Sequence, residues 1–122
     1  MKQPRLLVAD DEEMIRTIIR LALGDSYEIV EAGDGEEAWQ QFINASPPFD
    51  LVVMDLTMPR VDGQTLLQRM LARSPNTRII LLTGRLDFTH KSHPLVRVIT
   101  KPFDNTRLAK TVADLLVLSS SS

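Results

Sequence analysis

The sequence predicts an α/β fold, a doubly wound parallel sheet of five strands with helices on both faces. Five short apolar runs alternate along the chain with segments of helix length. Several of these runs are apolar at nearly every position, which is typical of strands buried on both faces of a parallel sheet. Right-handed crossovers between such strands then place helices on both sides.

Composition bounds the class of protein before any motif is considered. A chain of 122 residues suits one domain with its own core. The formal net charge of −2 gives no electrostatic reason to expect nucleic-acid or membrane binding. Cysteine is absent, which excludes disulfides and thiol chemistry, and no apolar run approaches the length of a membrane span. We therefore expect a soluble, cytoplasmic protein.

The first unit pairs a buried strand at residues 6–9 with an amphipathic helix at residues 14–23. Acidic residues 10–13 lie between them, and acids suit the positive end of a helix dipole. We expect Asp11 to cap this helix and Gly24 to end it.

The second unit begins with residues 27–32, which alternate between polar and apolar and are compatible with an edge strand. Asp34 is a candidate cap for a helix at residues 36–45. The prolines at residues 47 and 48 close that helix.

The third strand, residues 50–54, is followed by Asp55 and leads through a loop to a helix at residues 64–72. Buried strands are also expected at residues 78–82 and 96–99.

Two segments near the end complete the chain. Residues 85–94 are polar with weak periodicity, so the fourth helix is expected to be short or irregular. Asp104 is expected to cap a last helix at residues 105–118. We expect one domain at residues 1–118, with 119–122 as a low-complexity tail or a cut linker.

Polar side chains that carry chemistry gather at the carboxyl ends of the expected strands. The set is Asp10 and Asp11 after the first strand, Asp55 after the third, Thr83 after the fourth and Lys101 after the fifth. Because these ends share one edge of a parallel sheet, the side chains converge there, where open α/β sheets bind ligands.

This set suits phosphoryl transfer. Three carboxylates in one crevice need a cation, and their hard oxygens suit Mg²⁺. Lys101 adds a point charge for a phosphoryl oxygen, and Thr83 adds a hydroxyl donor. Gly84 leaves open space beside them. A carboxylate then serves as the nucleophile.

Taken singly, each residue has an ordinary explanation. Asp10 and Asp11 suit a solvated helix N-terminus, Asp55 suits a surface acid, and Lys101 suits a solvated lysine before a turn. Their occurrence together, each at its own strand end, favours a functional site.

Four motifs resemble, in order and spacing, the receiver domain of two-component response regulators. They are VADDE at residues 8–12, MDLTMP at 54–59, LTG at 82–84 and TKPF at 100–103. The resemblance extends from about residue 5 to residue 118. It implies a flavodoxin-like fold with strand order 2-1-3-4-5 and a cis bond before Pro102.

The resemblance also implies roles for the acids. Asp55 would accept a phosphoryl group from a histidine kinase or a histidine phosphotransfer protein. Asp11, Asp55 and the backbone carbonyl of Thr57 would ligate Mg²⁺, and Asp10 would act on the metal through water.

Two further roles follow from the resemblance. Lys101 would pair with Asp55 and then with the phosphoryl group, and Thr83 would swing in to bond that group. The domain would be a signalling module rather than an enzyme, and an output domain or a target protein would be a further partner.

The sequence departs from the family pattern in its switch region. Val98 stands where receivers usually carry an aromatic residue or histidine, and the span from Thr83 to Lys101 is short by roughly one helical turn. These departures put the usual dimer face in doubt, and we expect a monomer or a weak dimer. Arg85 and Thr57 are expected either to influence access of water to the site or to be ordinary exposed residues.

Two other functions compete with the signalling hypothesis. A Mg²⁺-dependent phosphatase using an aspartyl phosphate generally has its nucleophile on the first strand, a second acid two residues on and a cap domain, whereas this chain has adjacent acids and no cap insertion. A receiver-like interaction module with altered or lost switching is favoured by Val98 and by the short span before Lys101. The sequence does not specify the kinase, the output or the pathway, nor whether the domain is free-standing or part of a longer protein.

Overall fold

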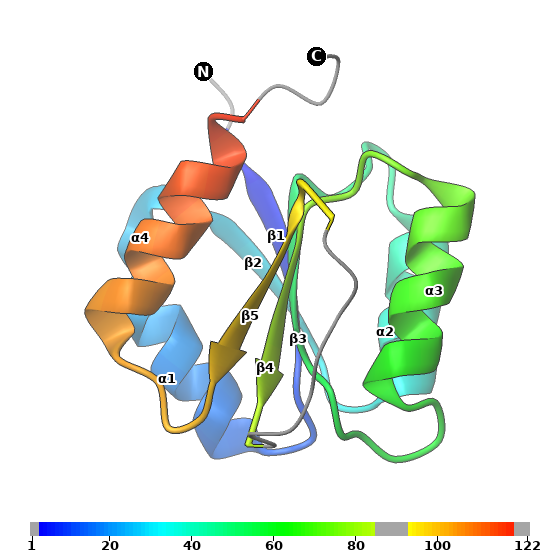
Figure 1. The fold of residues 1–122 in the computed structure, drawn as a ribbon, viewed down its shortest axis with the longest axis horizontal. Coiled ribbons are helices and arrows are strands. Elements are labelled where there is room, and N and C mark those ends of the chain that lie inside the picture. The colour runs from blue at the N-terminus through cyan, green and yellow to red at the C-terminus, as the bar shows by residue number, and fades with distance from the viewer. Residues whose placement is uncertain (1–2, 85–92, 119–122) are drawn as a thin grey trace.

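In the computed structural model, which describes residues 3–84 and 93–118, five parallel strands form one sheet in the order β2-β1-β3-β4-β5 (Figure 1). The strands are β1 Arg5–Ala9, β2 Glu28–Ala32, β3 Leu51–Asp55, β4 Ile79–Thr83 and β5 Val96–Thr100. The predicted fold class, strand order and edge position of β2 are confirmed.

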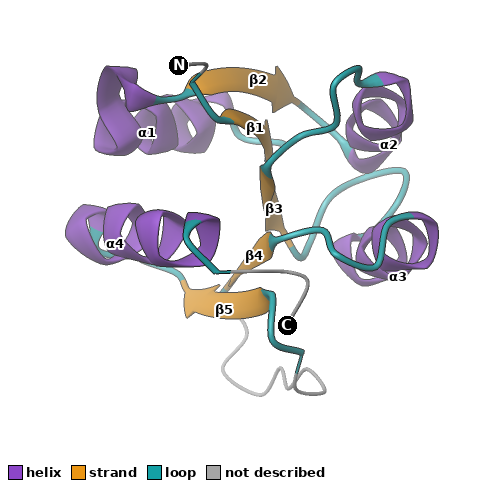
Figure 2. Ribbon diagram, turned by 90° about the horizontal axis from the view of Figure 1, so that it is seen from above, coloured by secondary structure: helices purple, strands orange, loops and turns teal. Residues whose placement is uncertain are grey.

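Four helices within the described residues cover the sheet, with α1 and α4 on one face and α2 and α3 on the other (Figure 2). Their bounds are α1 Glu13–Leu23, α2 Gly35–Asn44, α3 Gly63–Arg73 and α4 Asn105–Leu116, and a short 3-10 helix η1 follows α1 at Gly24–Ser26. The expected irregular helix before β5 falls largely on residues 85–92, which lie outside the described residues. None of the described helices is long and apolar enough to span a bilayer.

The central strands are buried because alternate side chains enter two separate cores. Leu7 and Met54 pack in the core beneath α2 and α3, whereas Val8 and Val53 pack in the core beneath α1 and α4. All five residues of β3 and of β4 are buried, as expected for strands covered on both faces. The ends of these strands are therefore held at fixed positions.

The N-cap residues match the sequence-based predictions at two helices and differ from them at two others. The carboxylates of Asp34 and Asp104 accept backbone N–H groups at the starts of α2 and α4, as predicted. Asp62 caps α3 in the same way, which the sequence analysis missed. The predicted cap by Asp11 is wrong: the cap residue of α1 is Glu12, without a side-chain cap bond.

Small boundary shifts matter at the site. The third strand runs one residue further than expected, so Asp55 is its last residue rather than the residue that follows it. The last helix ends at Leu116, two residues before the expected end at Leu118. The peptide bond between Lys101 and Pro102 is cis, as the resemblance implies.

Candidate functional site

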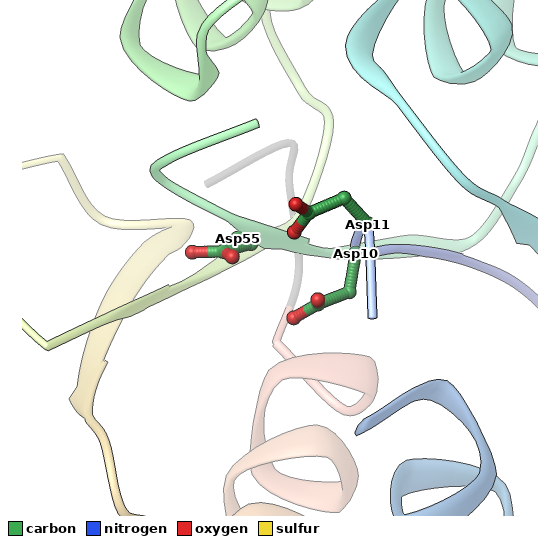
Figure 3. A group of neighbouring side chains, drawn as sticks. All are labelled: Asp10, Asp11 and Asp55. Carbon is green, nitrogen blue, oxygen red and sulfur yellow. The ribbon is translucent and has the colours of Figure 1, made fainter. Parts of the chain in front are cut away.

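The carboxyl ends of β1 and β3 bring three acids together (Figure 3). Asp10 and Asp11 follow β1, and Asp55 closes β3. One carboxylate oxygen from each lies within 4.8 Å of the others. Asp10 and Asp55 are buried, whereas Asp11 is exposed to solvent. The predicted convergence of the acids is therefore present.

Lys101 joins this group from the end of β5. Its Nζ lies 3.1 Å from Oδ2 of Asp10 and 3.2 Å from Oδ2 of Asp55. The backbone N–H of Lys101 donates to the carbonyl of Thr83 at 2.7 Å, which fixes the start of the following loop against β4. One ammonium group thus bridges the two buried carboxylates.

Burial and pairing act in opposite directions on these charges. Burial raises the pKa of Asp10 above its ordinary value, against the opposing effects of the Glu12 N–H and of Lys101. Burial also disfavours the Lys101 ammonium, but hydrogen bonding to Asp10 and the charges of Asp10 and Asp55 outweigh it and raise the pKa of Lys101. Lys101 therefore stays cationic, whereas ionisation of the buried Asp10 carboxyl is energetically unfavourable.

The residues present fit a divalent cation. Three carboxylates and one ammonium leave a net charge of −2, which a single Mg²⁺ would neutralise. Two oxygens bound to one Mg²⁺ lie at most about 4.2 Å apart. The observed spread of 4.8 Å comes within a small side-chain adjustment of that limit. This spacing is compatible with Mg²⁺ held directly by Asp11 and Asp55, with Asp10 beside them.

The loop after Asp55 is held tightly against its neighbours. The Thr57 N–H donates to Oδ1 of Asp55 at 3.1 Å, and the Leu56 N–H donates to the carbonyl of Leu82 at 2.8 Å. A Cβ on Gly63 would lie 2.6 Å from the carbonyl oxygen of Asp55 and from Leu56. Only glycine permits this close approach of α3 to the end of β3.

The same loop is tied to the start of α2. Arg60 adopts a left-handed φ of 73° and pairs with Asp34 at 3.4 Å. The Gly35 N–H donates to the carbonyl of Pro59 at 3.4 Å. The loop that carries Thr57 is thus fixed at both ends.

The switch and access residues have distinct surroundings. Thr83 is buried at the end of β4. Val98 is half-buried on β5 and packs on the core beneath α2 and α3. Gly84 is exposed, and no described atom lies within 4 Å of a Cβ built on it. Arg85 lies outside the described residues.

Sequence reasoning missed a charged cluster beside the site. Arg16 of α1 donates to the carbonyl oxygen of Asp10 and to Glu31 of β2, and Arg20 donates to the same Glu31. No spacing rule signals these contacts, because they join residues whose proximity depends on how α1 packs against β2.

A family model for the response regulator receiver domain matches residues 6–113. The chain belongs to the response regulator receiver domain family. Receiver domains are signalling domains rather than conventional enzymes, and they bind Mg²⁺ through acidic residues. They interact with histidine kinases or phosphotransfer proteins and with output domains.

Individual relatives agree with this membership. Chemotaxis protein CheY of Treponema pallidum is 30% identical over 118 residues, covering 92% of this chain and 82% of CheY. Sporulation initiation phosphotransferase F of Bacillus subtilis is 30% identical over 126 residues, covering 99% of this chain and all of the relative. The chain spans only 49% of the probable transcriptional regulator ycf27 of Porphyridium aerugineum.

Solved receiver structures share the fold. The signal receiver domain of an HD domain-containing protein from Pseudomonas fluorescens Pf-5 superposes with a TM-score of 0.84 at 29% identity, covering 94% of this chain and 95% of that one. The receiver domain of the hybrid histidine kinase CckA gives a TM-score of 0.75 at 32% identity, covering 92% and 98%.

Proposed function

We propose that residues 1–118 act as a receiver that accepts a phosphoryl group on Asp55 in a Mg²⁺-dependent reaction. The donor is a phosphohistidine of a histidine kinase or a histidine phosphotransfer protein. The observation that carries the proposal is the bridge from the Lys101 Nζ to both Asp10 and Asp55, beside the third acid. A solvated lysine and three unrelated surface acids would not converge in this way.

In the proposed step, a carboxylate oxygen of Asp55 attacks phosphorus as the bond between phosphorus and the histidine nitrogen breaks. The phosphoryl group becomes an acyl phosphate on Asp55, and the histidine nitrogen regains a proton from solvent. Oδ1 of Asp55 is oriented by the Thr57 N–H, and Oδ2 is held by Lys101. The nucleophile is therefore preorganised at the end of a rigid strand.

Asp11, Asp55 and the backbone carbonyl of Thr57 would hold Mg²⁺, with Asp10 acting through water. When bound, the metal would neutralise charge that builds up on the phosphoryl oxygens. Lys101 would remain with those oxygens after transfer, since an ammonium suits a phosphoryl oxygen as well as a carboxylate.

Thr83 is proposed to turn its hydroxyl toward the phosphoryl group and so to couple the chemistry to β4 and β5. Val98 on β5, which has no aromatic ring, packs on the core beneath α2 and α3. Gly84 is proposed to leave the site open on this side, and Arg85 and Thr57 are proposed to influence access of water to the acyl phosphate.

An apolar hollow offers a place for the protein donor. It has a volume of about 340 Å³ and is lined by Ile15, Ile18, Lys101, Pro102 and Phe103. Because Lys101 lines this hollow and also contacts Asp55, a donor seated here would have its histidine close to the nucleophile. We propose this hollow as the docking surface for the phosphohistidine-bearing protein.

Labelling tests the proposal directly. Purified protein incubated with acetyl phosphate and Mg²⁺ should acquire one phosphoryl group, and Asp55→Asn should abolish the labelling. Asp25→Asn, which changes an exposed acid in η1, is the matched control and should label normally. Absence of labelling in the intact, Mg²⁺-bound wild type would rule out the proposal, whereas repeated turnover of a phosphate ester would favour the phosphatase.

A second measurement tests the docking surface. Ile18→Glu should strongly slow transfer from a phosphorylated histidine phosphotransfer protein while labelling by acetyl phosphate stays near the wild-type rate. Equal effects of Ile18→Glu on both donors would contradict docking at the hollow.

A further inference from the structure

Arg16 lies in the first turns of α1 and reaches back over the connection from β1. Its side chain is only 17% exposed. One guanidinium nitrogen, Nη1, donates to the backbone carbonyl oxygen of Asp10 at 2.6 Å, and Nε donates to Oε1 of Glu31 at 2.9 Å. A single planar group therefore joins α1, the end of β1 and β2.

Glu31 is in turn held from a second side. Arg20 donates to Oε2 of Glu31 through Nε at 3.1 Å and through Nη2 at 2.6 Å. The carboxylate thus bonds Arg16 through one oxygen and Arg20 through the other. This arrangement fixes the orientation of the Arg16 guanidinium.

The contact to Asp10 matters because it is made to a backbone oxygen. A peptide unit is planar, so holding the carbonyl oxygen of Asp10 also fixes the amide nitrogen and the Cα of Asp11, the atom from which the Asp11 side chain leaves the chain. The other side of Asp10 is anchored as well, since its N–H donates to the carbonyl of Ala32 at 3.1 Å. Asp11 itself is exposed and would otherwise have freedom to turn away.

We infer that Arg16 is a positioning residue that aims Asp11 at the acidic site by holding the peptide unit between Asp10 and Asp11. This inference rests on the proposed function, because its consequence is expressed as Mg²⁺ affinity. Partners that orient metal ligands from outside typically change metal affinity by about 10- to 100-fold when removed.

The alternative is that Arg16 merely ties α1 to β2 through an ion pair. Arg20 provides the matched control, because it lies on the same helix and pairs with the same Glu31, whereas the Asp10 carbonyl is bonded by Arg16. A purely structural role predicts similar effects of the two arginines on Mg²⁺ binding. A positioning role predicts that they differ.

The experiment is titration calorimetry of the purified protein with MgCl₂ and no phosphodonor. Arg16→Ala should weaken Mg²⁺ binding by about tenfold or more. Arg20→Ala should change Mg²⁺ affinity by less than about twofold. Arg16→Lys should have an intermediate effect, because a single ammonium lacks the planar set of donors that bonds both the Asp10 carbonyl and Glu31. Thermal unfolding in the absence of metal establishes that each variant is folded.

Two further measurements keep the test decisive. Glu31→Ala leaves Arg16 in place but removes its support, and it should weaken Mg²⁺ binding by several-fold even if Arg16→Ala does not fold. In acetyl phosphate labelling, Arg16→Ala should raise the Mg²⁺ concentration needed for half-maximal rate, while the rate at saturating Mg²⁺ stays within about twofold of wild type.

The outcomes separate this inference from the proposed function. If the wild type binds Mg²⁺ and Arg16→Ala binds it equally well, or if Arg16→Ala and Arg20→Ala weaken it equally, the positioning role is overturned. If the wild type does not bind Mg²⁺, the proposed function and this inference fall together. Weakening specific to Arg16 and Glu31 supports the positioning role.

Discussion

Lys101 sets the charge balance of the site. Its ammonium is the shared partner of two buried carboxylates, at 3.1 Å from Asp10 and 3.2 Å from Asp55. A cation at this position makes the buried acids tolerable, but it also uses oxygens that would face a metal ion. Lys101 and Mg²⁺ therefore compete for the same carboxylates, and the ammonium of Lys101 weakens Mg²⁺ binding.

Lys101→Met should consequently strengthen Mg²⁺ binding by several-fold while slowing phosphorylation by at least about tenfold, because the ammonium no longer competes for the acids but is also lost to the phosphoryl group. Titration calorimetry with MgCl₂ and labelling by acetyl phosphate give the two quantities. Lys110→Met, which removes an exposed lysine of α4 instead, is the control. Weaker Mg²⁺ binding by Lys101→Met would contradict this view of the charge balance.

Glu31 provides a pH-dependent contribution to stability. The hydrogen bond from Arg20, followed by that from Arg16, outweighs burial and holds the pKa of Glu31 below its ordinary value of 4.5. A lowered folded-state pKa means that the stabilisation is fully present above pH 4.5 and is lost as the pH falls through the lower folded value.

Glu31→Gln should therefore lower the free energy of unfolding at pH 7 by up to about 1 kcal/mol, since the pair is partly exposed, and the difference from wild type should vanish near pH 2. Urea unfolding at a series of pH values measures this difference. A difference that is constant across the whole pH range would show that the loss is not electrostatic.

At the scale of elements, the connection from β3 to α3 is the best-fixed part of the site. Its backbone is bonded to β4 at one end, and Gly63 packs directly against the end of β3 at the other. The atoms that a Cβ at position 63 would meet belong to the backbone of Asp55 and Leu56. Backbone atoms cannot change rotamer to relieve the clash.

Gly63→Ala should therefore destabilise the domain by about 1–3 kcal/mol and weaken Mg²⁺ binding, because the strain acts on the peptide that carries Asp55. Gly84→Ala makes the same chemical change in open space and should alter stability by less than about 0.5 kcal/mol. Urea unfolding compares the two variants. Equal destabilisation would show that the packing against Asp55 is not the cause.

The sequence predicted elements well where local chemistry decides them. Apolar runs located all five strands within a residue or two, and Asp34 and Asp104 were recognised as caps from their positions before helices. The predicted Asp11 cap is wrong: the Asp10 carboxylate accepts the Glu12 N–H, and Glu12 rather than Asp11 is the N-cap residue of α1.

Within the site, the sequence predicted which acids converge, because the ends of parallel strands share an edge. It did not predict Arg16 and its partner Glu31, which belong to α1 and β2. Their contact depends on helix packing and side-chain reach, which neither periodicity nor motif spacing encodes. The burial of Asp10 and its bond to Lys101, 91 residues away, likewise required the folded structure.

At the scale of the whole molecule, the site joins distant parts of the chain. Its residues come from the ends of β1, β3 and β5, which lie at one edge only in the folded sheet. An unfolded chain would not hold these carboxylates together, so metal binding should be coupled to folding.

MgCl₂ at about 100 times its Kd should raise the free energy of unfolding by about 2.7 kcal/mol, which corresponds to a rise of several degrees in Tm. Asp11→Asn should lose most of this rise, whereas Asp25→Asn should keep it. Calorimetric melting with and without MgCl₂ measures the effect. An equal rise in Tm for Asp11→Asn and wild type would place the stabilising metal elsewhere.

Chemical trapping of the acyl phosphate shows directly whether Asp55 is the phosphoacceptor. Protein labelled by acetyl phosphate and Mg²⁺ is reduced with borohydride, which converts an acyl phosphate into an alcohol at the modified residue, and is then mapped by peptide mass spectrometry. We predict a single modified residue, Asp55, and none in protein incubated without Mg²⁺. Modification at Asp10 or Asp11 instead, or an unmodified peptide around Asp55, would contradict the account.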